Sequence, residues 1–467
     1  MHKSLVRKVL ILGIIVLFIG ACILPSIGGN IVEKHRPINN RELLLNYDNR
    51  GDTLYVGGSG PGNYTTIQEA VNDASAGDTI FVYNGIYYES HIIINRSMNI
   101  IGENKEKTVI TDGSGAKILL ITGNNVNISG FTIKEGYMGI GIYSTSTKNT
   151  ISNNLFTSNS RYGIYLSSNE HNTIQENIFS DCGADHGDAI SLQYSNNNTI
   201  YGNSFSNCGI SVSTSYHNFV EDNSVNDKPL VYIEEKSDFD ITVNAGQIIL
   251  INSENVRIKN QNISSINWGI IVYSSNNCLL QNNTITYANI GIYVYQSNGN
   301  DVIENNISFC TNGIVFGESH NNIISNNCIF SNNQYGLYFY VEPLVFASNN
   351  NSIMFNIIKN NNEGICLISS NFTKILYNVF TRNDKAIRIY YTKNTSINKN
   401  NFIQNRKDAY FNRCFTNNWN NNYWDRFRFL PKPIFGLKTG KLFPITIGIE
   451  FDRNPSQEPY LEKSSDE

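Results

Sequence analysis

Charged side chains are scarce in this sequence. Asp, Glu, Lys and Arg make up 16% of its 467 residues, where about 25% is usual in soluble proteins. The 35 basic and 39 acidic side chains give a formal net charge of −4, and no basic run occurs beyond the first ten positions. Because nucleic-acid backbones are bound by clustered Lys and Arg, the composition argues against a nucleic-acid partner.

Helical periodicity is missing between the repeated strands of this chain, and so is the leucine spacing of leucine-rich repeats. A repeat of 22 residues is present instead. Its leading positions are Gly269, Gly291 and Gly313, and Gly364 and Ala386 repeat the same interval further on. Such units contact only their neighbours, so we predict one long repeat domain rather than two or three globular ones.

Each repeat begins with an alternating segment. Ile292 and Val294 alternate with Tyr293 and Tyr295 after one leading glycine, and a period of two is typical of a β-strand. Asparagine then recurs in two columns, the second at Asn154, Asn177, Asn203, Asn223, Asn283, Asn305, Asn327, Asn356, Asn378 and Asn400. We predict that these asparagines take left-handed backbone angles at the bends and that their stacked amides hydrogen-bond from turn to turn.

A short helix is predicted ahead of the repeats. Thr66 and Glu69 form a capping-box pattern, and the apolar residues of the next turns, Ile67, Ala70, Val71 and Ala74, share one helical face. An amphipathic helix placed across the first turn of a solenoid shields its apolar end and its unpaired strand edges.

The first ten positions also carry basic residues, and an apolar run from Val9 to Leu24 follows them. This pattern predicts a secretory signal or an uncleaved signal anchor, and Cys22 would also suit a lipoprotein cleavage site. We therefore expect the body of the protein to be extracellular or at the cell surface, with membrane anchorage through the N-terminus as one alternative.

The stretch TIQEAVNDASAGDTIFVYNGIYYE, which begins at Thr66, and the later SMNIIGENKEKTVITDG resemble the N-terminal cap of the pectin-lyase-like superfamily of right-handed parallel β-helices. From about Gly139 the repeats resemble the NosD-type β-helix and the carbohydrate-binding and sugar-hydrolysis repeat domain. The segment NNWNNNYWDRFRFLPKPI, from Asn417 to Ile434, resembles the closing module of archaeal surface members. This fold hosts lyases, hydrolases, epimerases, adhesins and accessory proteins, so the resemblance implies a fold more than a chemistry.

We therefore predict an all-β fold, a right-handed single-stranded parallel β-helix with an N-terminal capping helix. The predicted division of the chain is a signal peptide or anchor at 1–29, a polar linker at 30–50, the cap and first turns at 51–135, repeats at 136–414 with degenerate turns and a loop at 225–264, a closing module at 415–452 and a disordered tail at 453–467.

Acidic residues and a histidine are concentrated in one long turn. Asp185, His186 and Asp188 lie there, and such groups could perform general acid/base chemistry on a sugar. Asp185 and His186 faintly resemble part of the mannuronan epimerase signature. The motifs of polygalacturonases and pectate lyases are missing, however, so a hydrophilic loop is the other interpretation and the sequence favours a protein that is not an enzyme.

Cys182 and Cys208 each lie five residues after a ladder asparagine, so we expect them on adjacent turns about 4.8 Å apart. A disulfide there and a pair of stacked free thiols are the two alternatives. Only four methionines exist, and none lies near a histidine cluster. Although NosD-type proteins are sometimes described as copper-binding, we predict neither a metal nor another cofactor.

Tyrosines form the main surface feature. If Ile292 and Val294 point inward, the alternation exposes a column of phenols on one sheet, at Tyr165, Tyr273, Tyr293, Tyr295, Tyr338, Tyr340 and Tyr390. Such rings could stack on sugars, or they could merely stabilise the sheet as a cross-strand ladder.

Three functions are predicted as alternatives. The first is a surface protein that binds a polysaccharide or an envelope glycan, or that has a structural role, without catalysis. The second is a polysaccharide lyase, C5-epimerase or glycoside hydrolase. The third, an accessory factor for metalloenzyme maturation, is implied by the NosD resemblance alone.

Overall fold

The computed structural model describes residues 51–460 except 144, 185–186, 341–347, 426–427, 429 and 439–445. They belong to the second of two compact units, which are 1–50 and 51–467. The predicted signal segment, the predicted linker and positions 461–467 of the predicted tail lie outside the described residues. Within the described part, no helix is long and apolar enough to cross a membrane.

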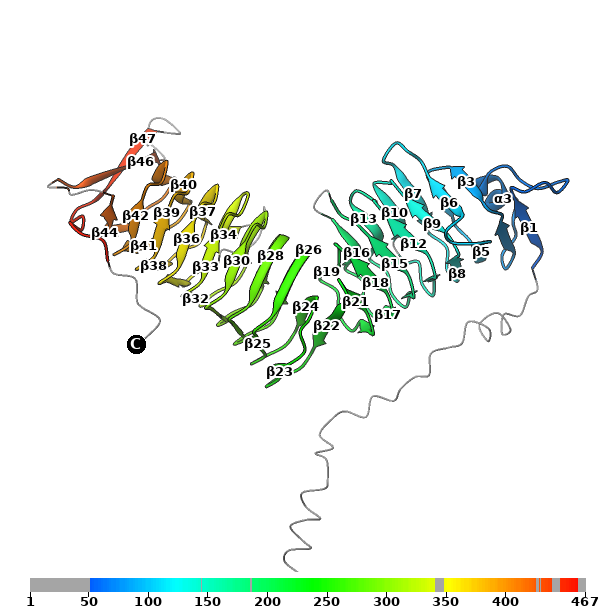
Figure 1. The fold of residues 1–467 in the computed structure, drawn as a ribbon, viewed down its shortest axis with the longest axis horizontal. Coiled ribbons are helices and arrows are strands. Elements are labelled where there is room, and N and C mark those ends of the chain that lie inside the picture. The colour runs from blue at the N-terminus through cyan, green and yellow to red at the C-terminus, as the bar shows by residue number, and fades with distance from the viewer. Residues whose placement is uncertain are drawn as a thin grey trace, which may run out of the picture. The chain divides into compact units, whose positions relative to one another are not determined.

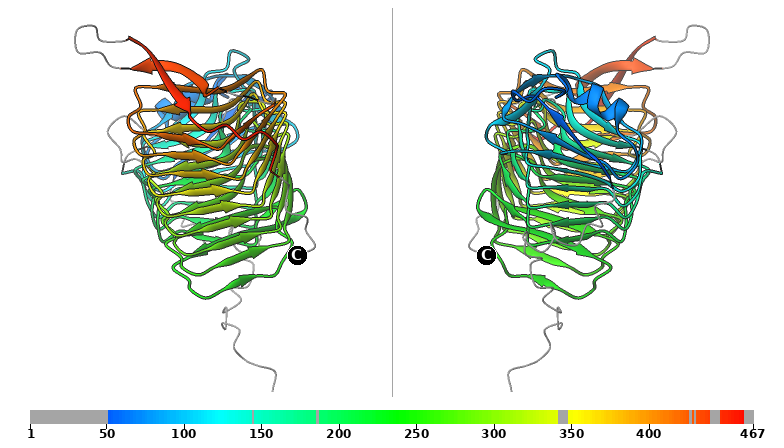
Figure 2. Two further views of the ribbon diagram at one scale, coloured as in Figure 1. Left: turned by 90° about the vertical axis from the view of Figure 1, so that its left-hand side faces the viewer. Right: turned by 90° about the vertical axis from the view of Figure 1, so that its right-hand side faces the viewer.

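Most turns of the chain contribute one strand to each of three parallel sheets, and on either side of one interruption the strands stack side by side (Figure 1). Seen from either end, successive turns lie over one another (Figure 2). We call the sheet that begins each repeat the leading sheet, and the two that follow it the middle and closing sheets. This is the predicted right-handed parallel β-helix.

The leading sheet consists of β4 (Ile92–Ile94), β7 (Lys117–Ile121), β10 (Met138–Tyr143), β13 (Tyr162–Ser167), β16 (Asp188–Gln193), β19 (Ile210–Ser213), β22 (Lys228–Glu234), β24 (Gln247–Ile251), β26 (Asn262–Tyr273), β28 (Thr284–Tyr295), β31 (Asn312–Gly317), β34 (Tyr335–Tyr340), β37 (Glu363–Ile368), β40 (Lys385–Tyr390), β43 (Lys407–Asn412) and β46 (Lys432–Lys438). The middle sheet consists of β1 (Thr53–Val56), β2 (Thr79–Val82), β5 (Met98–Gly102), β8 (Val126–Ser129), β11 (Thr150–Ser152), β14 (Thr173–Gln175), β17 (Thr199–Tyr201), β20 (Phe219–Glu221), β23 (Asp240–Ile241), β25 (Arg257–Lys259), β27 (Leu279–Gln281), β29 (Asp301–Ile303), β32 (Ile323–Ser325), β35 (Ser352–Met354), β38 (Lys374–Leu376), β41 (Ser396–Asn398), β44 (Asn418–Asn420) and β47 (Thr446–Asp452). The closing sheet consists of the first residues of β26 and β28 together with β3 (Gly85–Tyr88), β6 (Thr108–Thr111), β9 (Thr132–Lys134), β12 (Leu155–Thr157), β15 (Ile178–Ser180), β18 (Ser204–Ser206), β21 (Ser224–Val225), β30 (Asn306–Ser308), β33 (Cys328–Phe330), β36 (Ile357–Lys359), β39 (Val379–Thr381), β42 (Asn401–Ile403) and β45 (Tyr423–Trp424).

The core lies inside the three sheets and is built from the inward residue of each alternating pair. Ile292 and Val294 are fully buried, as predicted. Phenylalanines stack on one another in register, for example Phe156 on Phe179 with ring centroids 4.8 Å apart. Burial of such aromatic and branched side chains is the main stabilising term, and no single turn could achieve it alone.

The asparagine ladder is present, and it has a direction. The side-chain oxygen of Asn305 accepts hydrogen bonds from the backbone N–H and the amide of Asn283 on the preceding turn, both at 2.9 Å. The predicted left-handed backbone is wrong for the ladder asparagines themselves. It occurs one residue earlier, as at Glu304 and Tyr377, with φ of 58° and 57°, which leaves the asparagine free to turn its side chain into the core.

The predicted capping helix is α3 (Ile67–Asp73). The hydroxyl of Thr66 accepts a hydrogen bond from the backbone N–H of Glu69 at 3.2 Å, as expected of an N-cap residue. The carboxylate of Glu89 accepts two more, from the N–H groups of Ile67 and Gln68. The helix buries the apolar face that the sequence predicted, on Ile67, Ala70 and Val71.

The leading sheet is interrupted after β19. The next leading strand, β22, pairs with β24 and forms an antiparallel pair with β21. The buried side chain of Gln247 spans the interruption: its amide accepts from Ile210 N at 3.0 Å and donates to Ile210 O at 2.8 Å and to Trp268 O at 3.0 Å. A side-chain amide therefore replaces the backbone pairing that a regular turn would supply.

The C-terminal end is closed by the antiparallel pair β46 and β47 and by tryptophans. Trp424 stacks on Phe402 at 4.3 Å. One carboxylate oxygen of the buried Asp452 accepts hydrogen bonds from the backbone and side-chain N–H groups of Asn422 and from the indole of Trp424. Asp452 therefore takes the place of the next ladder asparagine.

Candidate functional site

The seven predicted tyrosines all belong to the leading sheet. Their columns follow the strand register, which pairs Tyr273 with Tyr295, Tyr295 with Gly317 and Gly317 with Tyr340. Six are half-buried, namely Tyr165, Tyr293, Tyr295, Tyr338, Tyr340 and Tyr390.

Tyr273 differs from the prediction, because it is only 2% exposed. Its hydroxyl lies 3.1 Å from both the backbone nitrogen and the hydroxyl of Thr214. Thr214 follows β19, so the interruption of the leading sheet places it over this ring. Burial raises the pKa of Tyr273 to about 12.

Three of the tyrosines pack together over a glycine. The hydroxyls of Tyr293 and Tyr340 are 2.7 Å apart, and the rings of Tyr293 and Tyr295 stack at 5.9 Å. A Cβ atom at Gly317 would lie 2.7 Å from Tyr340 and 2.8 Å from Tyr295, so the glycine makes room for both rings. This group behaves at least in part as a cross-strand ladder.

Asp188 is the described member of the predicted catalytic set, whereas Asp185 and His186 lie outside the described residues. Asp188 is the first residue of β16 and is 3% exposed, so it does not belong to a solvated hydrophilic loop. Its register partner is Tyr162 on the preceding turn, and the ring of Tyr162 stacks on Tyr165 at 4.9 Å.

The surroundings of Asp188 favour a carboxyl that titrates near neutrality. Desolvation raises the pKa of Asp188 to about 7, although Ser211, Trp268 and the guanidinium of Arg161 partly offset this shift. Arg161 donates hydrogen bonds to Tyr162 at 3.2 Å and to Tyr137 at 2.9 Å. Among the described residues, Asp188 Oδ1 has no hydrogen-bond partner.

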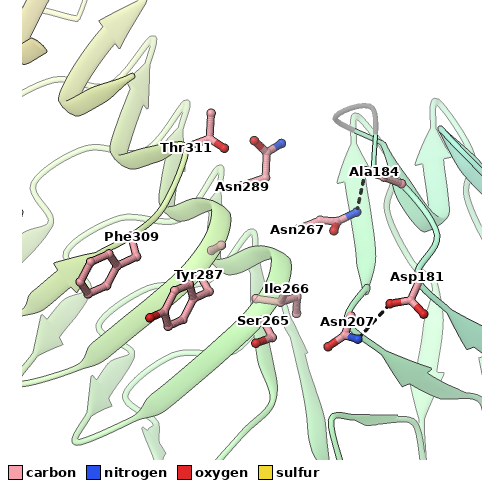
Figure 3. A pocket seen from close by; sticks show the side chains of 12 residues that line it. Asp181, Ala184, Asn207, Ser265, Ile266, Asn267, Tyr287, Asn289, Phe309 and Thr311 are labelled. Atoms are coloured by element: carbon pink, nitrogen blue, oxygen red, sulfur yellow. Dashed lines mark hydrogen bonds between the residues drawn. The ribbon is translucent and has the colours of Figure 1, made fainter. Parts of the chain in front are cut away.

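A cleft of about 540 Å³ lies beside this turn, where the turns on either side of the interruption face each other. Figure 3 shows Tyr287 and Phe309 next to each other on one side, with Asp181 and Asn207 opposite and Asn267 between. Tyr287 is 62% exposed and Phe309 45%, and their rings stack at 5.2 Å. This exposed aromatic pair was not predicted from the sequence.

The opposite wall of the cleft is polar. Asn207 donates to the Asp181 carboxylate at 2.9 Å, and hydrogen bonds from Asn207 and Ser180 lower the pKa of Asp181. The amide of Asn267 donates to the carbonyl oxygens of Gly187 and Cys182 across the interruption. An ionised acceptor and several amides therefore face two exposed rings, an arrangement suited to a polyhydroxylated ligand.

Cys182 and Cys208 are both buried, and both are free thiols in the structure. Each thiol contacts a carbonyl oxygen two residues earlier, at 3.6 Å for Ser180 and 3.2 Å for Ser206. Burial raises the pKa of the Cys182 thiol to about 11. The thiol is therefore protonated at neutral pH and shielded from solvent, whereas a reactive cysteine is an accessible thiolate.

One group of possible metal ligands occurs among the described residues. The ligand atoms of His217, Glu234 and Glu235 lie within 4.8 Å of one another. His217 and Glu235 are exposed, and Glu234 is held by Tyr232, whose hydroxyl donates to it at 2.9 Å.

Two family models match the chain. The one described as "Periplasmic copper-binding protein (NosD)" matches residues 71–245, and the one described as "Right handed beta helix region" matches 246–422. The two matches meet inside the interruption and together span most of the described turns. The chain is therefore a right-handed parallel β-helix that resembles both families. No curated protein matches this β-helix chain.

Solved structures of other β-helix proteins are similar only distantly. The A-module of the Azotobacter vinelandii mannuronan C-5 epimerase AlgE6 is 11% identical over 73% of this chain and 89% of its own, with a TM-score of 0.29. A mannuronic acid-specific family 6 lyase from human gut microbiota is 13% identical over 71% and 87%, with a TM-score of 0.35. The catalytic domain of a GH87 α-1,3-glucanase is 13% identical over 73% and 65%, with a TM-score of 0.33. Scores this low support no functional comparison.

The side chains of this β-helix do not fit copper. Copper sites draw on convergent His, Cys and Met ligands, but Met98 and Met138 are in the core and the thiols of Cys182 and Cys208 face backbone carbonyls. In the described part of the NosD match, the one ligand group combines a single imidazole with two carboxylates. We therefore assign no chemistry of this chain to copper.

Proposed function

We propose that the protein binds a polysaccharide, without catalysis, in the cleft between Asp181 and the Tyr287–Phe309 pair. The exposed stacked pair carries this proposal, because flat apolar rings beside hydrogen-bonding groups suit the faces and edges of sugar rings. The tyrosine columns of the leading sheet remain a proposed extension of this surface. An extracellular or surface location, predicted from the N-terminus, would place the cleft where such polymers occur.

The two rings differ from other exposed aromatic residues in their packing rather than in their backbone. Tyr287 and Phe309 have φ of 55° and 56°, in the left-handed region that large side chains seldom occupy. Burial does not explain the rings either, since both are exposed. Phe372 combines the same exposure and backbone angle outside the cleft, so what distinguishes Tyr287 and Phe309 is that their rings stack on each other in the wall of the cleft.

Replacing both rings by glycine, in a Tyr287→Gly/Phe309→Gly variant, is expected to weaken binding ten- to thirty-fold. Each stacking contact contributes about 1 kcal/mol, and glycine keeps the left-handed backbone without strain. A glycan array would identify the bound glycan, and titration calorimetry would measure its affinity.

The matched control is Phe372→Gly. Phe372 is also an exposed aromatic residue, at 53%, with a left-handed φ of 54°, but it lies outside the cleft. It should leave the affinity unchanged. Wild-type affinity in the double variant, or a wild type that binds no glycan, would contradict the proposed function.

Catalysis by Asp188 is the second candidate, and its pKa of about 7 is the observation that favours it. A carboxyl that is half protonated near neutral pH can act as a general acid or base. If catalysis occurs, polysaccharide treated with the protein should show new reducing ends or unsaturated uronates, and Asp188→Asn should abolish them. Asp185→Asn/His186→Ala is expected to do the same. Products that persist in Asp188→Asn would remove this candidate.

A further inference from the structure

The leading sheet contains one arrangement of side chains twice. The sequence Tyr-Gly-Ile-Tyr begins at Tyr162 in β13, and Tyr-Gly-Leu-Tyr begins at Tyr335 in β34. In both, the two tyrosine rings stack on each other, with centroids 4.9 Å apart at 30° in β13 and 4.3 Å apart at 16° in β34.

On the following turn, the register partner of the first tyrosine is a buried acid in both cases. Asp188 pairs with Tyr162 and is 3% exposed, and Glu363 pairs with Tyr335 and is 4% exposed. Each acid has one carboxyl oxygen, Asp188 Oδ1 or Glu363 Oε2, that lacks a hydrogen-bond partner among the described residues.

The equivalence extends one turn further. In the first copy Tyr165 pairs with Ser191, and Ser191 pairs with Ser211. In the second copy Tyr338 pairs with Cys366, and Cys366 pairs with Arg388. Ser211 and Arg388 therefore occupy equivalent positions. Both act on the acid: Arg388 pairs with Glu363, and Ser211 favours the ionised form of Asp188.

Packing alone does not account for this arrangement. A buried acceptor without a donor costs about 1–3 kcal/mol. At the same register position the neighbouring turns hold apolar, amide or basic residues instead of an acid, namely Lys117, Met138, Ile290, Asn312, Lys385 and Lys407. A sugar residue supplies what is missing, because its ring face stacks on tyrosine and its hydroxyl groups donate hydrogen bonds.

We propose that these are two copies of one sugar-binding site, centred on Asp188 and Glu363. This inference rests on the proposed polysaccharide-binding function but uses residues outside the cleft. Two linked sites raise the overall affinity for a long chain above that of either site, since the second contact is intramolecular.

The copies differ in charge. Lys385 pairs with Glu363 at 3.0 Å, and Arg388 also contacts this carboxylate, so the copy at Glu363 has two cations for one acid. The copy at Asp188 has Arg161 nearby, bonded to Tyr162 rather than to the acid.

The test compares equivalent variants, Tyr165→Ser and Tyr338→Ser, singly and together, with Tyr88→Ser, an exposed tyrosine on β3 of the closing sheet, as the control. Titration calorimetry with a panel of short neutral and uronic-acid oligosaccharides gives the number of sites. Each single variant should bind one fewer oligosaccharide per chain, the double variant two fewer, and the control as many as the wild type. Trp268 lies beside Asp188, so its fluorescence change on binding should persist in Tyr338→Ser and disappear in Tyr165→Ser.

The outcomes separate this inference from the proposed function. If both single variants bind as many oligosaccharides per chain as the wild type, or if only one of them binds fewer, the twin sites are wrong. A weaker binding of the Tyr287→Gly/Phe309→Gly variant would still support the cleft. If both single variants bind fewer oligosaccharides but the Tyr287→Gly/Phe309→Gly variant binds with wild-type affinity, the cleft is not a binding site and the twin sites stand. A wild type that binds none of the panel would overturn both. Melting temperatures of all variants check that each is folded.

Discussion

Replacing Asn305 by alanine is expected to lower the free energy of unfolding by about 2–6 kcal/mol, since four buried hydrogen bonds are lost at about 0.5–1.5 kcal/mol each. The Asn305 amide donates to Leu280 O at 2.9 Å and to Asn327 Oδ1 at 3.0 Å, and its oxygen accepts two hydrogen bonds from Asn283. The residue is 1% exposed, so water cannot replace these bonds without opening the turn. Urea unfolding would measure the change.

The neighbouring residue offers a matched control. Asn306 is exposed and lies on β30, so Asn306→Ala should change the stability by less than about 0.5 kcal/mol. Similar effects of the two substitutions would show that the ladder contributes little and that the stacked apolar core alone holds the turns together.

The Asp188→Asn variant is expected to be more stable than the wild type at high pH by as much as about 4 kcal/mol, which corresponds to about three pKa units at 1.36 kcal/mol each. Burial raises the pKa of Asp188 from 3.8 to about 7. The folded state therefore binds more protons than the unfolded state between these values, and wild-type stability falls as the pH rises through that window. Below the lower value both states are protonated and the advantage of the variant vanishes.

Unfolding of both proteins at about pH 4 and about pH 8 would check this sign. Glu106→Gln is a suitable control, because Glu106 is exposed and its replacement should produce no comparable pH dependence. A variant that is less stable than the wild type at the higher pH would mean that the ionised carboxylate is stabilised in the folded protein, through Arg161 or the polar side chains around it.

The parts of the structure that repeat were predictable from sequence. The period of two identified Ile292 and Val294 as core residues, and Thr66 with Glu69 marked the start of α3, because both patterns depend on local geometry alone. The ladder of Asn283 and Asn305 was predicted for the same reason, although the left-handed residue is the one before each asparagine.

The parts that break the repeat were not predictable in the same way. Tyr273 follows the outward pattern and is nevertheless buried, because the interruption brings Thr214 against it. Tyr287 lies inside β28 at a residue with a left-handed φ of 55°, and Phe309 directly follows β30 with a φ of 56°, so the strand period does not apply to either ring. A cleft between residues about eighty positions apart also leaves no local pattern. The sequence nevertheless contains a pattern that relates the two rings: Tyr287 lies four residues before Gly291, and Phe309 lies four residues before Gly313.

Asp452 has a consequence for how long the protein can grow. Each ladder asparagine both accepts from the turn before it and donates to the turn after it, so the ladder is a polar chain that any further asparagine could extend. A carboxylate accepts but has no N–H to offer, and Asp452 uses one oxygen for Asn422 and Trp424. This column of the ladder therefore stops at Asp452, which has no side-chain N–H with which a further turn or a second molecule could extend it.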